Sequence, residues 1–143
     1  MKQVPKKFWA GGFLFNPQTH EVFLHKRDEH TTFNPNKWAF FGGLNEGNET
    51  PKECFLRELH EEIGLSLGPG EVGLYREYLN VELDTYRYAF YGVSEVTKDE
   101  LVLGEGAGFD WIPSDKLSEY DLTEKTREDL AFFVEYLSDG WGD

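Results

Sequence analysis

The stretch GGLNEGNETPKECFLRELHEEIGL, Gly42 to Leu65, decides how the chain is interpreted, because it contains a helix with both of its ends marked. Thr50 can accept a hydrogen bond at a helix N-cap, and the proline that follows suits the first helical position. Glu53, three residues after Thr50, completes a capping box. Gly64 suits the position at which a helix ends in a left-handed turn. The pattern therefore predicts a helix from Pro51 to Ile63.

This helix is expected to have an apolar face and an acidic face. At about 100° per residue, four apolar side chains share one side: Phe55, Leu56, Leu59 and Ile63. Three carboxylates lie together on the other side, joined by Cys54: Glu58, Glu61 and Glu62. Neighbouring like charges destabilise a helix, and no lysine one turn away lies on this face to relieve them. Either the acidic face is solvated, or it binds hard divalent cations such as Mg²⁺ and Mn²⁺, which prefer carboxylate oxygens.

The composition of the whole chain limits the possible function classes. The 143 residues, of which 39% are hydrophobic, predict one globular domain over residues 1–143. The single cysteine, Cys54, excludes an internal disulfide and fits a reducing compartment. We find no convincing signal peptide and no stretch approaching the roughly 20 apolar residues of a membrane span. A cytoplasmic protein without a membrane partner is therefore expected.

The net charge of −13 argues against binding to a nucleic-acid polymer, which relies on basic patches that displace counterions from phosphates. A small anionic substrate remains possible if metal ions bridge it to the carboxylates. Most of the 27 acidic residues are expected to be solvated and to aid solubility.

The remaining segments alternate between strand and helix patterns. Strands are expected over residues 8–15, 21–27, 38–41 and 111–113, with two or three more within residues 69–96. A second helix should start near Thr123, with a core-facing apolar stripe at i, i+3, i+4 and i+7: Leu130, Phe133, Val134 and Leu137. This mixture predicts an α/β domain whose sheet packs between helices.

With its flanks, the opening stretch resembles the Nudix box, Gly-x5-Glu-x7-Arg-Glu-U-x-Glu-Glu-x-Gly-U, in which U is a bulky aliphatic residue. Every defined position is filled, by Gly43, Glu49, Arg57, Glu58, Leu59, Glu61, Glu62, Gly64 and Leu65. The chain is therefore identified as a member of the Nudix hydrolase family, similar to its MutT-like branch. The resemblance implies an α/β/α sandwich with a mixed β-sheet between helices.

The resemblance also implies a reaction. Nudix hydrolases use Mg²⁺, with Mn²⁺ as a possible substitute, to cleave the diphosphate linkage of a nucleoside diphosphate joined to another group X. The family's metal ligands match Glu58, Glu61 and Glu62, assisted by a backbone carbonyl near Gly43. Bound cations would neutralise the substrate's charge, activate water and stabilise the leaving oxygen.

Two further box residues take roles from the resemblance. Arg57 would orient a catalytic glutamate, and Glu49 would pair with Arg57. The alternative for this pair is a structural ion pair that closes the loop onto the helix. Gly64 has the structural role of ending the helix.

Outside the box, Glu105 lies in the segment EGAGFDW, which resembles a loop of MutT-like members. The resemblance makes Glu105 an additional metal ligand or the general base, against the alternative of a surface acid. Arg27 resembles a basic residue that touches substrate phosphates, against simple solvent exposure. The general base is either Glu58 or Glu105, and activity should rise toward alkaline pH. Phe41 stands where many members have proline, which would affect the loop or the substrate pocket.

The resemblance favours a nucleoside triphosphate, canonical or oxidised, as the substrate, with a nucleoside monophosphate and pyrophosphate as products. The alternatives are hydrolysis of ADP-ribose, sugar nucleotides or dinucleoside polyphosphates, or a non-catalytic Nudix-fold module that only binds a nucleotide. A monomer and a homodimer are both compatible with the sequence.

Overall fold

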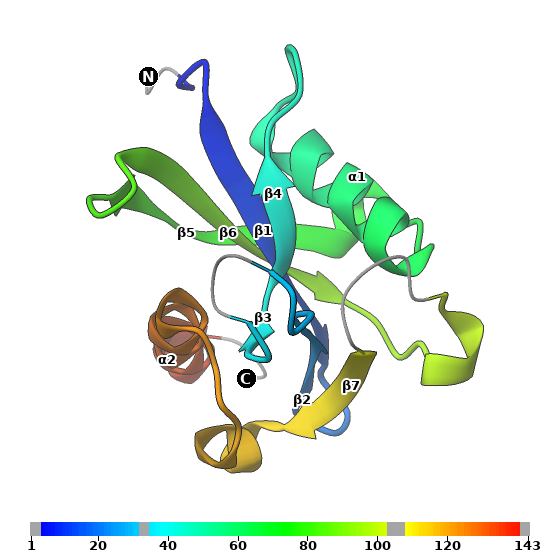
Figure 1. Cartoon of the computed structure of the whole chain (residues 1–143). Coiled ribbons are helices and arrows are strands. Elements are labelled where there is room, and N and C mark those ends of the chain that lie inside the picture. Colours follow the sequence, from blue (N-terminus) through cyan, green and yellow to red (C-terminus); the bar gives the residue numbers. More distant parts are fainter. Residues whose placement is uncertain (1–3, 32–34, 103–107, 141–143) are drawn as a thin grey trace.

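The computed structural model describes residues 4–31, 35–102 and 108–140 (Figure 1). The strands are β1 (Phe8–Asn16), β2 (Glu21–Lys26), β3 (Trp38–Ala39), β4 (Phe41–Leu44), β5 (Val72–Asn80), β6 (Thr85–Val93) and β7 (Gly108–Pro113). The helices are α1 (Pro51–Ile63) and α2 (Glu124–Gly140), with short 3-10 segments η1 (Pro69–Glu71), η2 (Lys98–Glu100) and η3 (Ser114–Glu119).

The described strands form one mixed sheet of seven strands. Its order is β3-β2-β1-β6-β5, with β4 also pairing with β1 and β7 with β2. β1 runs parallel to β6, and the other pairs are antiparallel. α1 and α2 lie on opposite sides of this sheet, and each contributes to a separate hydrophobic core (Figure 1). The prediction of an α/β fold with a mixed sheet between helices is confirmed.

Glycines let β1 approach two neighbouring strands closely. A Cβ atom at Gly11 would lie 2.4 Å from the carbonyl oxygen of Phe41, and one at Gly12 would lie 1.9 Å from that of Phe90. Both distances are far below van der Waals contact, so glycine is needed at both positions. Because of these contacts β4 can lie directly on β1, which fixes the position of Gly43 in the sheet.

The strand expected at residues 38–41 is in fact two short strands with different partners, since β3 pairs with β2 and β4 pairs with β1. β4 also continues beyond the expected end, through the two glycines to Leu44. Phe41 is fully buried in the core on the α1 side, where its ring stacks against Phe23 and His25. The residue in place of the common proline therefore acts as a core residue.

The helix ends agree with the sequence pattern. The Thr50 hydroxyl accepts from the Glu53 backbone N–H at 3.2 Å, the Glu53 carboxylate accepts from the Thr50 N–H at 2.9 Å, and Gly64 has a φ of 69°. In α2, the prediction for Val134 was wrong, because this residue is 48% exposed while Phe133 is buried. Within the described part of the chain, no helix is long and apolar enough to cross a membrane.

Candidate active site

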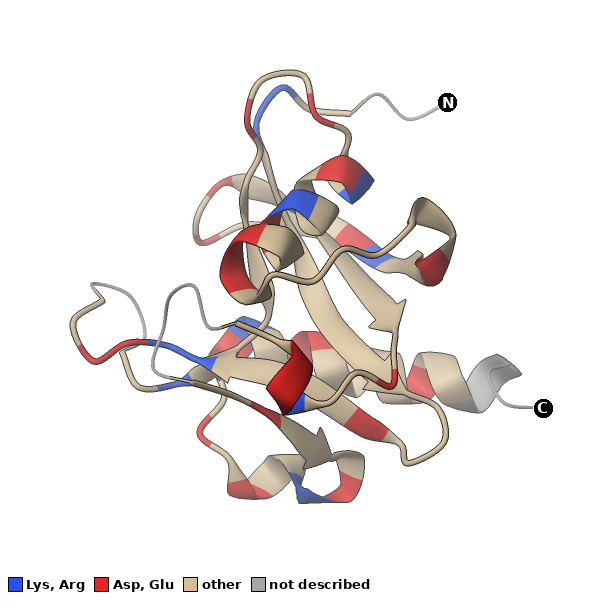
Figure 2. Cartoon of the chain, turned by 90° about the vertical axis from the view of Figure 1, so that its right-hand side faces the viewer, with Lys and Arg blue, Asp and Glu red and all other residues tan. Residues whose placement is uncertain are grey.

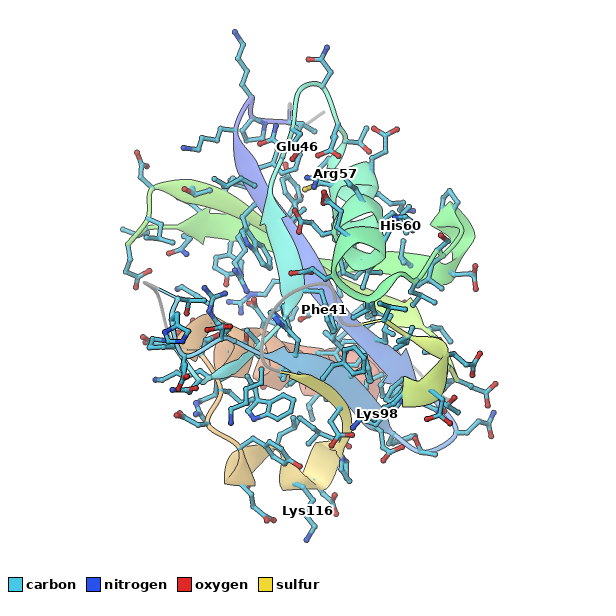
Figure 3. All side chains as sticks on the ribbon, turned by 45° about the vertical axis from the view of Figure 1, so that its right-hand side comes forward. Phe41, Glu46, Arg57, His60, Lys98 and Lys116 are labelled. Carbon is cyan, nitrogen blue, oxygen red and sulfur yellow. The ribbon has the colours of Figure 1, made fainter. Side chains whose placement is uncertain are left out.

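Arg57, on α1, is surrounded by carboxylates. Its Nη1 atom donates to Glu58 Oε1 at 3.0 Å and to Glu61 Oε2 at 2.6 Å. Its Nε and Nη2 atoms donate to the two carboxylate oxygens of Glu49. Figure 3 shows Arg57 on α1 beside the loop that carries Glu46, and Figure 2 shows acidic and basic residues together along this helix. No lysine lies on the acidic face, as the sequence indicates, but Arg57, one turn before Glu61, supplies the cation that relieves the like charges.

The ion pair between Arg57 and Glu49 joins the loop after β4 to α1. The side chains are 21% and 16% exposed. The hydrogen bond from Arg57 holds the pKa of the Glu49 carboxyl below its usual range, and the bond to Glu49 raises the pKa of Arg57. Arg57 Nη2 also donates to the carbonyl oxygen of Leu44 at 3.3 Å. The expected pairing is confirmed, and it stays charged throughout the neutral pH range.

Gly43, on β4, lies against the Glu58 carboxylate. A Cβ atom at position 43 would lie 2.6 Å from Glu58 Oε1, so a side chain here would displace the carboxylate. On the same side, Cys54 Sγ lies 3.6 Å from the carbonyl oxygen of Gly43. Burial raises the pKa of the Cys54 thiol to about 12, so it is protonated at neutral pH and unsuited to act as a nucleophile. Small residues at 43 and 54 thus let the helix approach the strand.

The three glutamates of the acidic face differ in burial. The Glu61 side chain is 52% exposed and that of Glu58 is 14% exposed, whereas Glu62 as a residue is only 5% exposed. Glu62 therefore lies toward the interior beside Ile63, a difference that the helical period alone did not predict.

A cavity of about 890 Å³ adjoins Glu62. Its walls come from β1, β2, β4, β6, the turn after β5 and the start of α2, and they include Trp9, His25, Arg27, Asn80, Arg87 and Lys125. Arg27 thus shares a cavity with Glu62, in a position where a basic side chain could meet a substrate. Sequence reasoning missed Asn80, Arg87 and Lys125, because no local pattern marks them and only the fold brings them together.

Arg87, on β6, is fixed in the cavity wall by two contacts. Its Nε atom donates to Asp129 Oδ2 at 2.8 Å, and its guanidinium carbon lies 3.9 Å from the centre of the Trp9 ring. Asp129, on α2, is fully buried and also accepts from Arg76 at 3.0 Å and from the Tyr78 hydroxyl at 2.8 Å. A buried carboxylate with this number of donors is well compensated, so the network ties α2 to the sheet at the cavity.

The chemistry of the box residues suits a divalent cation. The carboxylates of Glu58, Glu61 and Glu62 and the carbonyl of Gly43 are hard oxygen donors. Among residues 4–31, 35–102 and 108–140, however, no three acidic, histidine or cysteine side chains converge as a ligand cluster. Glu58 and Glu61 point to Arg57, so joint ligation with Glu62 would require their side chains to turn. Glu105 lies outside the described residues.

Comparison with known proteins identifies the family. Residues 6–133 match the family model of the NUDIX domain. The chain belongs to the Nudix family. One similar curated protein is the dihydroneopterin triphosphate diphosphatase of Haemophilus influenzae, which is 26% identical over 135 residues, covering 85% of this chain and 83% of that protein. Another is the nucleoside triphosphatase NudI of Salmonella paratyphi B, 26% identical over 107 residues, covering 68% of this chain and 76% of that protein.

Solved structures show the same Nudix fold. A MutT structure from a study of the Aliivibrio salmonicida and Vibrio cholerae proteins superposes with a TM-score of 0.76 at 21% identity, covering 92% of this chain and 99% of that one. The NUDIX domain of Shewanella oneidensis NrtR, complexed with ADP ribose, gives a TM-score of 0.74 at 14% identity, covering 94% and 90%. The predictions of the family, of its fold and of a Nudix hydrolase are confirmed.

Proposed function

We propose that this Nudix hydrolase cleaves a nucleoside triphosphate to a nucleoside monophosphate and pyrophosphate, with Mg²⁺ as its cofactor and Mn²⁺ as a possible substitute. The observation that carries the proposal is that Glu62 of the Nudix box and Arg27 line one cavity of about 890 Å³. Ligand sites commonly have volumes of about 300–1,000 Å³, and this cavity is therefore large enough for a nucleotide. The two curated relatives described above, named as a triphosphate diphosphatase and a nucleoside triphosphatase, support a triphosphate substrate.

In the proposed reaction, the oxygen of water forms a bond to the α- or the β-phosphorus atom, and the phosphoanhydride bond between these two atoms breaks. The leaving group is then pyrophosphate or the nucleoside monophosphate, respectively. The proton of the water passes to a general base, either Glu58 or Glu105. Mg²⁺, when bound, would neutralise phosphate charge and lower the pKa of water. Glu58, Glu61, Glu62 and the Gly43 carbonyl would hold the cation.

Hydrogen bonds in the structure support the parts of Arg57 and Glu49 in this proposal. Arg57 donates to Glu58 and would orient its carboxylate as this turns toward the cation, while Glu49 holds Arg57 in place. Arg27 would attract the substrate phosphates through its charge. We further propose that residues 1–143 act as one Nudix domain, which the family match over residues 6–133 supports.

The proposed activity is tested by measuring phosphate and pyrophosphate release from a panel of nucleotides, with Mg²⁺ and with a chelator. The panel contains canonical and oxidised nucleoside triphosphates, ADP-ribose, sugar nucleotides and dinucleoside polyphosphates. Metal-dependent pyrophosphate release from a triphosphate is the expected result. Faster hydrolysis of another nucleotide class in the panel would mean that this class, and not a triphosphate, is the substrate. If nothing is hydrolysed but nucleotides still bind, the protein is a binding module.

Glu62→Gln tests the assignment of the metal site. The amide keeps the size of the side chain but loses the charge that a hard cation requires, so Mg²⁺-dependent turnover should fall by several orders of magnitude with the fold retained. Glu135→Gln, at an exposed position on α2, is the matched control and should behave like the wild type. Near-normal turnover of Glu62→Gln would mean that Glu62 is not a ligand of the metal ion.

A further inference from the structure

Asn80 is a buried polar residue for which neither the fold nor the Nudix box accounts. It is the last residue of β5, pairs with Thr85 across the hairpin, and is only 5% exposed. Its Oδ1 atom is buried and accepts no hydrogen bond from the described residues. Buried acceptors in native proteins nearly always have a partner, so this acceptor is suited to a donor that a ligand brings to the described residues.

Asn80 lines the same cavity as Glu62. The turn between β5 and β6 and the helix α1 lie on opposite sides of β1 and β4 (Figure 1). Asn80 and Glu62 therefore reach the cavity from different elements, β5 and α1. A substrate with its phosphates near the Nudix-box carboxylates would extend from them along the cavity that Asn80 also lines.

The charges around Asn80 favour a neutral ligand group over a phosphate. Lys125 Nζ lies 3.2 Å from a carboxylate oxygen of Glu82, and Arg87 is paired with Asp129. Lys125 and Arg87 thus each have a carboxylate partner, whereas a phosphate site would present unmatched positive charge. The ring of Trp9 forms part of the same wall, with the Arg87 guanidinium over one face, and it adds apolar surface to this wall.

We propose that Asn80 determines the base specificity of the enzyme, its Oδ1 atom accepting a hydrogen bond from an N–H group on the heterocycle of the substrate. This inference rests on the proposed function, because it takes the cavity as the nucleotide site. The recognised class is a nucleotide whose heterocycle carries an N–H donor on the edge that enters the cavity. A base whose donor is replaced by a methyl group leaves the acceptor buried and unpaired, so the enzyme discriminates against it.

The test is a chemical comparison of substrates in two variants. The triphosphate that the wild type prefers is compared with its N-methylated analogue, which lacks the donor, and with ribose 5-triphosphate, which lacks the base. Asn80→Leu removes the acceptor at similar size, and Asn80→Asp retains an acceptor. Val81→Ala, at the 76% exposed neighbouring position, is the matched control. Circular dichroism checks that each variant is folded.

In the wild type, we expect kcat/KM for the preferred triphosphate to exceed that for its methylated analogue by about 10- to 100-fold, as for one buried hydrogen bond. In Asn80→Leu this preference should vanish, and the ratio of kcat/KM for the nucleotide to that for ribose 5-triphosphate should fall by a similar factor. Asn80→Asp should restore part of the preference, and Val81→Ala should keep it.

Two kinetic results would overturn the proposal. An unchanged preference in Asn80→Leu would mean that the substrate does not use the acceptor, and an equal loss on ribose 5-triphosphate would mean a structural role.

If the wild type hydrolyses neither nucleotides nor ribose 5-triphosphate, the proposed function fails, and the inference is then decided by binding. Calorimetry with the nucleoside monophosphates should still show that Asn80→Leu weakens affinity for bases that carry a donor but not for ribose 5-phosphate, and equal affinities would refute it.

Discussion

Gly43 leaves the space in which the Glu58 carboxylate lies. We expect Gly43→Ala to reduce turnover of the nucleotide substrate, because the new Cβ atom would lie 2.6 Å from Glu58 Oε1 and force the carboxylate away. A displacement of about 1 Å at a catalytic group can cost about 100-fold in rate, and a loss of this order in kcat is expected. Steady-state kinetics, with circular dichroism to confirm folding, measures the effect.

Gly70→Ala is the matched control for this substitution. A Cβ atom at Gly70 would meet no heavy atom within 4 Å, and its φ is not in the left-handed region. Its turnover should equal that of the wild type. If Gly43→Ala also retained full turnover, the position of Glu58 against the strand would have no role in catalysis.

Single residues differ in how far the sequence reveals them. The box glutamates and the Glu49–Arg57 pair could be predicted because fixed spacing along one helix and its loop identifies them. The burial of Glu62 could not, because it depends on where the sheet and the cavity lie. Asn80 and Arg87 carry no local signal, since a polar residue on a strand becomes notable only when strand pairing turns it toward a cavity.

The helix α1 shows how much an element can be determined by its own residues. Its N-cap, capping box and left-handed C-terminal glycine agree with the predicted bounds, since each depends on contacts within a few residues. β3 and β4 show the opposite case. Four successive residues that read as one strand divide between two partners, and the choice of partner depends on β1 and β2 rather than on residues 38–41.

Thr50→Ala should lower the free energy of unfolding by about 1 kcal/mol, because the Glu53 backbone N–H loses its acceptor at the start of α1. Urea denaturation at pH 7 measures this change. Ser66→Ala, at an exposed position just after the helix, is the control and should leave the stability within about 0.5 kcal/mol of the wild type. Equal stability of Thr50→Ala and the wild type would show that the cap is not needed to hold α1.

At the scale of the whole molecule, the sheet brings residues from distant segments around one cavity. Glu62 comes from α1, Arg27 from the end of β2, Asn80 from the end of β5 and Lys125 from the start of α2. The sequence predicted that a sheet packs between helices, but which strand ends meet depends on strand order. That order includes the parallel pairing of β1 with β6, between residues far apart in the chain, which sequence patterns do not specify.

The stability of the whole molecule should depend on His25, which is buried on β2 in the cavity wall and donates from Nε2 to the carbonyl oxygen of Phe40 at 3.0 Å. Burial lowers the pKa of His25 to about 4 from an ordinary value of 6.5. Between these pH values the unfolded chain binds a proton at this ring and the folded chain does not, so the free energy of unfolding falls as the pH falls. The full loss below pH 4 would be about 3 kcal/mol.

His25→Gln removes this proton uptake and should flatten the fall in stability between pH 6.5 and pH 4, as measured by urea denaturation at a series of pH values. His60→Gln, at an exposed position on α1 (Figure 3), replaces a histidine that is not buried and should follow the wild-type profile. Carboxylates also titrate below pH 5, but they contribute equally to all three proteins, so the difference between the profiles isolates the histidine. If the free energies of unfolding of the wild type and His25→Gln changed with pH in parallel, His25 would not contribute to the fall in stability at low pH.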